Sequence, residues 1–159
     1  MPTAIPKPAD LRSLLNVRQF LVPSDGSLAS YEALAQAINV AKRNKGQVVV
    51  VHVIEVKRTL PLDADMPDDA MRGEEILSEA ERLAEQLDFK VEGELLQARE
   101  AGHAIVDEAI ERRTDAIVLG TEYKRPFGEF QLSRTIQYVM KHAPCQVWVY
   151  RLPARTGDR

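Results

Sequence analysis

The sequence predicts a single α/β domain in which helices cover both faces of a parallel β-sheet. Short β-branched runs alternate with amphipathic stretches along most of the chain, an order typical of strand–helix–strand units. The run Val48–Ile54 is β-branched at every position except His52, as expected of a strand buried on both faces. At 159 residues and 17.8 kDa, the chain has the length of one domain with its own core.

An N-terminal arm is expected before the first strand, over residues 1–16. Three prolines among the first eight residues predict a flexible segment whose first dozen residues hold no regular helix. Three leucines after them are expected to form one turn that covers the domain: Leu11, Leu14 and Leu15. The folded domain is predicted over residues 17–152, with a C-terminal tail over residues 153–159.

The first predicted strand–helix–strand unit spans residues 19–54. Gln19–Val22 is an apolar run ended by Pro23, and Ser24–Ser27 supplies turn and N-cap residues. Apolar residues then recur every three or four positions, which predicts a helix that ends near Lys45. Its buried face is expected to hold Leu28, Tyr31, Leu34, Ala35, Ile38 and Ala41. The Val48–Ile54 strand is placed at the centre of the sheet.

Residues 56–72 are predicted to form a long mobile loop, because proline and aspartate interrupt any apolar period there. A metal site in this loop is one reading of its aspartates, but a solvated loop is favoured. The aspartates are Asp63, Asp65, Asp68 and Asp69.

The second half of the chain repeats the alternation. The expected elements are a helix through Ile76, Leu77, Ala80, Leu83, Ala84 and Leu87, an edge strand over residues 89–95, a helix from Gly102 through Ile105, Val106, Ala109 and Ile110, a strand over residues 115–119, a loop to about Phe130, a helix through Leu132, Ile136, Val139 and Met140, and a strand over residues 147–150. Five strands and four helices predict a Rossmann-like three-layer sandwich around a five-stranded parallel sheet.

Composition excludes several classes of function. A net charge of −3 and a pI near 5.7 give no basic surface for a phosphate backbone, so no nucleic-acid partner is expected. Cys145 is the single cysteine, which rules out an internal disulfide and any zinc site of cysteine spacing. The longest apolar stretch, Val48–Val51, is too short to cross a bilayer. A cytoplasmic protein with no membrane partner is predicted.

Two segments stand where an open α/β sheet binds its ligands, beyond the carboxyl ends of its strands. Pro23–Ser27 follows the first strand, and Gly120 opens the loop after the fourth. A helix that begins beside them could present amide groups to an anion.

These segments carry a resemblance to a known family. Phe20–Ser27, Val51–Val53, Ile117–Gly120 and His142–Val147 together resemble the universal stress protein family, over about residues 18–151. The resemblance implies the five-stranded parallel fold and homodimers formed through the last strand, Gln146 to Tyr150. That strand is also apolar and close to the chain end, where no further strand can cover it.

ATP-binding members of this family carry a glycine, two residues, a second glycine, nine residues, and then glycine with serine or threonine. Here Gly120 fills the first position, Tyr123 replaces the second glycine, and Ser133 and Arg134 replace the final pair. Because glycine lets a backbone approach phosphate closely, these changes predict impaired phosphate binding. On this steric account, changing Tyr123, Ser133 and Arg134 back to the family's residues restores ATP binding.

The base and ribose side is better matched, since Pro23, Ser24, Asp25 and Val53 resemble that part of the family's pocket. Asp25 has the alternative role of capping a helix, and Val53 that of a core residue. Arg134 is either a charged fork for a phosphate or an exposed helix residue, and the second is slightly favoured. Thr135, beside it, completes the candidate set. The implied cofactor is ATP or AMP, and the residues themselves establish none.

No catalytic set is recognised. His52, within a strand of valines, is interpreted as a satisfied core histidine, and His103 as a residue at a helix start. His142 and Cys145 are close in sequence but lack a third, orienting group. The loop Lys124–Phe127 could receive an anion or a protein partner, although a basic loop is usually only solvated.

The resulting hypothesis is a non-catalytic regulatory or stress-response domain that binds an adenine nucleotide weakly or not at all. An ATP-binding switch of the same family is one alternative. Another is an enzyme that hydrolyses adenine nucleotides, of the related ATP-pyrophosphatase class; the segment Ser24–Ser30 does not match the Ser-Gly-Gly-X-Asp-Ser loop of that class. The stress, the pathway and any protein partner are not identified by the sequence.

Overall fold

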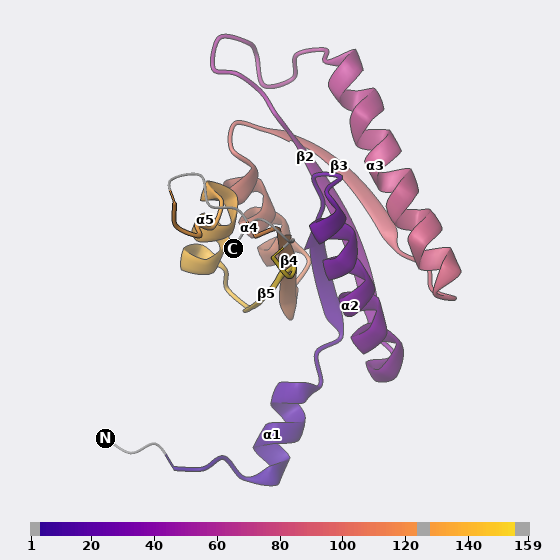
Figure 1. Cartoon of the computed structure of the whole chain (residues 1–159), viewed down its shortest axis with the longest axis vertical. Helices are drawn as coiled ribbons and strands as arrows, with labels where there is room; N and C mark the ends of the chain where they lie inside the picture. The colour runs from indigo at the N-terminus through magenta and orange to yellow at the C-terminus, as the bar shows by residue number, and fades with distance from the viewer. Residues whose placement is uncertain (1–3, 124–127, 155–159) are drawn as a thin grey trace.

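In the computed structural model, which describes residues 4–123 and 128–154, five parallel strands form one sheet with helices on both faces (Figure 1). The strand order is β3-β2-β1-β4-β5. The strands are β1 (Gln19–Pro23), β2 (Gln47–Glu55), β3 (Glu92–Ala98), β4 (Ala116–Thr121) and β5 (Gln146–Arg151). The helices are α1 (Pro8–Leu15), α2 (Leu28–Asn44), α3 (Pro67–Gln86), α4 (Ala101–Glu111) and α5 (Arg134–His142). The predicted α/β sandwich is confirmed.

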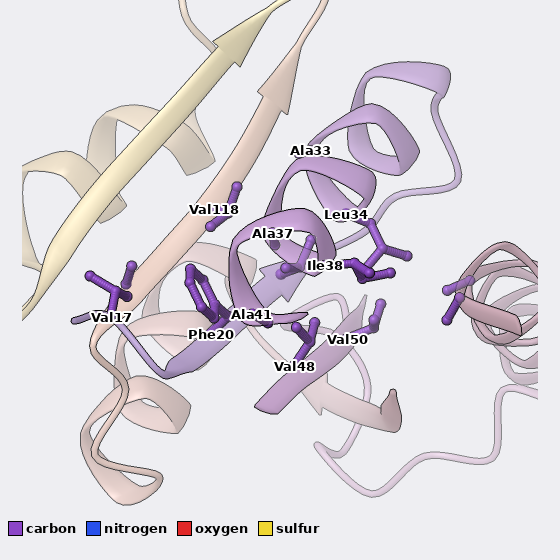
Figure 2. Packing of buried hydrophobic residues seen from close by; sticks show 14 of the residues in the cluster. Val17, Phe20, Ala33, Leu34, Ala37, Ile38, Ala41, Val48, Val50 and Val118 are labelled. Atoms are coloured by element: carbon purple, nitrogen blue, oxygen red, sulfur yellow. The ribbon is translucent and has the colours of Figure 1, made fainter. Parts of the chain in front are cut away.

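The core lies in two layers because neighbouring residues of a strand point to opposite faces of the sheet. In β1, Phe20 and Val22 belong to the cluster formed with α2 and α3, whereas Leu21 belongs to the cluster formed with α4 and α5. Figure 2 shows the first cluster, in which α2 lays its alanines over the sheet beside Leu34 and Ile38. The middle strands are therefore apolar on both sides, which explains their continuous β-branched sequence.

Two sequence expectations about the N-terminus are wrong. Residues 8–15 form the helix α1, so a regular helix does occur within the first dozen residues. Pro8 lies in its first turn, where proline costs no intrahelical hydrogen bond. The three leucines of this helix are also not buried against the domain, because Leu11, Leu14 and Leu15 are 42%, 57% and 73% exposed. Figure 1 shows α1 standing apart from the sheet.

The loop predicted over residues 56–72 is shorter than expected, since α3 begins at Pro67. Proline again opens the helix, and Asp68 and Asp69 lie in its first turn, where carboxylates interact favourably with the helix dipole. Two of the four aspartates of the predicted loop therefore belong to a helix. No group of metal-ligating side chains occurs among the described residues.

Smaller corrections concern position rather than type. The central strand is β1, and β2 is its neighbour. β3 is an edge strand, as predicted, but it begins at Glu92 instead of Phe89. Leu28, Ile110 and Met140 were assigned to apolar helix faces and are more than half exposed. A helical period identifies a face but not its edges.

Gly120, near the end of β4, fixes how closely that strand approaches α2. A Cβ atom at this position would lie 1.9 Å from the carbonyl oxygen of Ala29, in the first turn of α2. Only glycine fits such a contact with backbone, because neither side can move without shifting a whole element. Gly120 is thus required by packing, whether or not a ligand is present.

We expect Gly120→Ala to lower the free energy of unfolding by at least about 3 kcal/mol, because the added methyl group overlaps the α2 backbone. Gly93→Ala in β3 is the matched control, since its Cβ would meet nothing closer than 3.4 Å, and it should change stability by less than about 1 kcal/mol. Urea unfolding of both variants measures the difference. Equal stabilities of the two variants would contradict the role given to this contact.

Candidate functional site

A cavity of about 280 Å³ opens at the carboxyl ends of β1 and β4. The chain leaves β1 toward β2 and leaves β4 toward β5, so the strand order reverses here, which is where open α/β sheets bind ligands. The cavity walls come from the β1–α2 turn, the end of β2, the start of α4, the end of β4 and the start of α5. Its lining residues include Pro23, Ser24, Asp25, Ser30, His52, Val53, Glu55, Ala101, Ile105, Leu119, Gly120, Ser133 and Thr135. We call this space the switch-point cavity.

Ser24 organises the turn that forms one wall. Its amide donates to the carbonyl of Val51 at 2.8 Å, which continues the β1–β2 pairing past the strand end. Its hydroxyl lies 2.8 Å from the hydroxyl of Ser30 and accepts from the amide of Gly26 at 3.3 Å. Gly26 adopts a φ of 83°, which glycine reaches without strain. Ser24 is buried, so these bonds hold a rigid turn rather than a free ligand group.

The carboxylate of Asp25 accepts a hydrogen bond within its own turn and also lines the cavity. Its Oδ1 accepts from the amide of Ser27 at 2.9 Å. The residue that caps α2 is Ser27, whose hydroxyl accepts from the amide of Ser30 at 3.2 Å, so the alternative in which Asp25 is the cap is wrong. Asp25 is exposed and lines the switch-point cavity. Its carboxylate can accept hydrogen bonds from the hydroxyl groups of a ligand.

His52 is a site residue that sequence reasoning left in the core. Its ring is half-buried and its Nδ1 lies 2.7 Å from the carbonyl oxygen of Ser24. Because a carbonyl only accepts, Nδ1 carries the proton in this bond. His52 therefore ties the end of β2 to the β1–α2 turn and is satisfied, as predicted, while also lining the cavity.

The start of α5 forms the opposite wall. Ser133 is the N-cap of this helix, and its hydroxyl accepts from the amide of Ile136 at 3.2 Å. Ser133 and Thr135 line the switch-point cavity, whereas Arg134 between them lines a second hollow beside it. A serine in place of the family's glycine is thus a helix cap here.

Tyr123 lies away from the cavity lining. Its ring stacks on Phe130 with centroids 5.5 Å apart and planes 5° apart, and the guanidinium of Arg151 lies 5.1 Å from its centroid. This stack joins the loop after β4 to the end of β5, with a cation over the aromatic face. The ring therefore packs against Phe130 and Arg151 and does not obstruct the switch-point cavity.

The other sequence candidates do not assemble into a catalytic group. His103 stacks on Tyr138 at 4.1 Å and pairs with Glu100 at 2.7 Å on the helix surface. The ring centroid of His142 lies 4.3 Å from that of Tyr138, with the two planes tilted by 35°. Burial raises the pKa of the Cys145 thiol, which disfavours the reactive thiolate. The basic loop Lys124–Phe127 lies outside the described residues.

The structure thus brings seven of the nine predicted site residues to one cavity: Pro23, Ser24, Asp25, Val53, Gly120, Ser133 and Thr135. Sequence reasoning missed the contributions of Ser30, His52 and Glu55. Two of them could have been found from their place in the chain, because His52 and Glu55 lie near the carboxyl end of a predicted parallel strand, where such sheets bind ligands. Ser30 gave none, since a serine in a helix usually faces solvent or the backbone.

Comparisons with known proteins agree with this architecture. The Universal stress protein family profile matches residues 16–151. A universal stress protein of Methanocaldococcus jannaschii is 30% identical over 144 residues, which cover 87% of this chain and 84% of the relative. A universal stress protein of Archaeoglobus fulgidus superposes with a TM-score of 0.71 at 24% identity, covering 83% of this chain and 97% of that one. The same organism's protein in complex with dAMP superposes with a TM-score of 0.67, also at 24% identity, covering 83% of this chain and 96% of that one.

A bilayer-spanning segment is not found in the described part of the chain, since none of its helices combines the required length with an apolar sequence.

Proposed function

This chain belongs to the universal stress protein family, and we propose that it is a non-catalytic regulatory domain of the cytoplasm that binds an adenine nucleotide weakly. The observation that carries the proposal is the switch-point cavity, in which Pro23, Asp25 and Val53 lie together. Apolar walls with a few polar groups are the usual composition of a small-molecule site. The structure of a family member with dAMP supports an adenine nucleotide as the ligand.

Each wall has a distinct part in this proposal. Val53 and Ile105 offer apolar surface to a base, and the Asp25 carboxylate accepts hydrogen bonds from ribose hydroxyls. The rigid Ser24 turn positions Asp25 without a bound ligand. Affinity is low because the loop after β4 lacks the second glycine, and Tyr123 is engaged with Phe130 and Arg151, so this loop does not wrap phosphate.

We propose further that two chains associate through β5. This strand is an edge of the sheet that the described residues form, so one row of its backbone groups pairs with no other strand of that sheet. The amide of Gln146 donates to the carbonyl of Asp115, just before β4, and the amide of Leu152 donates to the carbonyl of Thr121, at the end of β4. Alternate residues of a strand bond to the same neighbour. The outward amides are therefore those of Val147, Val149 and Arg151.

The first test of nucleotide binding is calorimetry with adenosine. We expect the native chain to bind it and Asp25→Asn to weaken binding about tenfold, the cost of losing a charged hydrogen-bond acceptor. Stability should be retained, because asparagine still accepts from the Ser27 amide. Asp107→Asn, on the exposed face of α4, is the matched control and should bind normally. Absence of adenosine binding by the native chain would refute the proposal, and tight ATP binding would favour the switch alternative.

We also expect no appreciable ATP hydrolysis by the purified chain. Phosphoryl transfer needs positioned charge on the γ-phosphate and usually a bound metal. The acidic residues that line the cavity are Asp25 and Glu55, and the described residues contain no group of side chains that could hold a metal ion. Phosphate release should match that of buffer. Turnover that persists through further purification and disappears in Asp25→Asn would identify an enzyme instead.

Dimer formation is tested by Val149→Pro, compared with Val149→Thr. Proline removes one outward amide of β5 and leaves the bonds to β4 in place, whereas threonine keeps both the amide and the shape. Light scattering at micromolar concentration should show a dimer for the native chain and for the threonine variant, and a monomer for the proline variant. A native monomer, or a dimeric proline variant, would refute pairing through β5.

A further inference from the structure

A second hollow, of about 420 Å³, lies between the starts of α4 and α5 and borders the switch-point cavity. The two spaces share Glu55, Ala101 and Thr135 as walls. Arg134 lines only the second one. The two spaces are therefore adjacent, with Thr135 on their common border and Arg134 on the wall of the second. We call the second space the Arg134 hollow.

Two of the four acidic and basic side chains that line the Arg134 hollow already have partners. Arg99 donates from Nη1 to the carbonyls of Lys57 and Leu60, at 2.6 and 2.8 Å. Glu100 pairs with His103 at 2.7 Å. In the part of the chain that the structure describes, Arg134 and Glu55 are the charged lining residues that make no hydrogen bond or ion pair.

These two side chains define a ligand with two kinds of group. The guanidinium of Arg134 is a donor fork that matches the oxygens of a phosphate. The carboxylate of Glu55 only accepts, so it suits a hydroxyl or amino group, and it stands at the wall shared with the switch-point cavity. A nucleoside phosphate carries both kinds of group.

We propose that Arg134 binds the phosphate of a nucleoside monophosphate whose nucleoside occupies the switch-point cavity. The phosphate then lies between α4 and α5, away from the loop after β4. One guanidinium matches one phosphate group. Because Arg99 is held by backbone carbonyls, a further phosphate group would lie near the unpaired carboxylate of Glu55 with no second free cation among the described lining residues, which is unfavourable. The site therefore prefers AMP to both adenosine and ATP. This inference rests on the proposed function.

Calorimetry with adenosine, AMP and ATP tests it on the native chain, Arg134→Gln and Arg82→Gln. The native chain should bind AMP about tenfold more tightly than adenosine, with an advantage that shrinks as salt is added. ATP should bind no more tightly than AMP. Arg134→Gln should bind AMP and adenosine equally and keep the native adenosine affinity. Arg82→Gln, an exposed change of the same charge on α3, should behave as the native chain.

Three outcomes would overturn the proposal in distinguishable ways. Equal affinities of the native chain for AMP and adenosine would show that no phosphate is recognised, with the proposed function intact. An AMP advantage that survives Arg134→Gln would place the phosphate elsewhere, for example on the loop after β4. Failure of the native chain to bind either ligand would remove this inference and the proposed function together.

Discussion

The contact between Gly120 and the first turn of α2 is the constraint on which the rest of the site depends. Because the strand meets the helix backbone directly, with no side chain between them, the end of β4 and the β1–α2 turn lie at one fixed separation. Parallel pairing of the five strands then brings their carboxyl ends to one edge of the sheet. The switch-point cavity is the space left where α4 and α5 close over that edge.

Most of the fold could be predicted because its signals are local and repeated. The β-branched run of β2 and the period of α2 each satisfy one rule over many residues. The errors in helix position occur where a single proline decides whether the residues after it are helical. Pro8 and Pro67 were taken as breaks, whereas in the structure each opens a helix, and a sequence does not show on which side of a proline the helix lies.

The candidate site was predictable in its location and less so in its composition. Parallel strands bring their carboxyl ends to one edge, so Pro23–Asp25 and Gly120 could be placed together from chain order alone. The position of Arg134, which lines only the second space while its neighbour Thr135 lines both, could not be predicted, because it depends on where each side chain leaves the first turn of α5. For the same reason Tyr123 was interpreted as an obstruction, although its ring packs on Phe130 and Arg151.

Tyr123 and Ser133, which stand where the family's ATP-binding pattern has glycine, each make a contact within the protein. Ser133 in place of glycine gives α5 a side-chain cap, which stabilises the helix by roughly a few tenths of a kcal/mol relative to glycine. Tyr123 in place of glycine ties the loop after β4 to β5, the strand proposed to pair with a second chain. Each substitution therefore replaces a backbone suited to wrapping phosphate with a contact that stabilises the protein itself. With Tyr123 and Ser133 both engaged in contacts of the protein itself, the groups that distinguish one nucleotide from another in the proposed site are Glu55 and Arg134, at the cavity's other border.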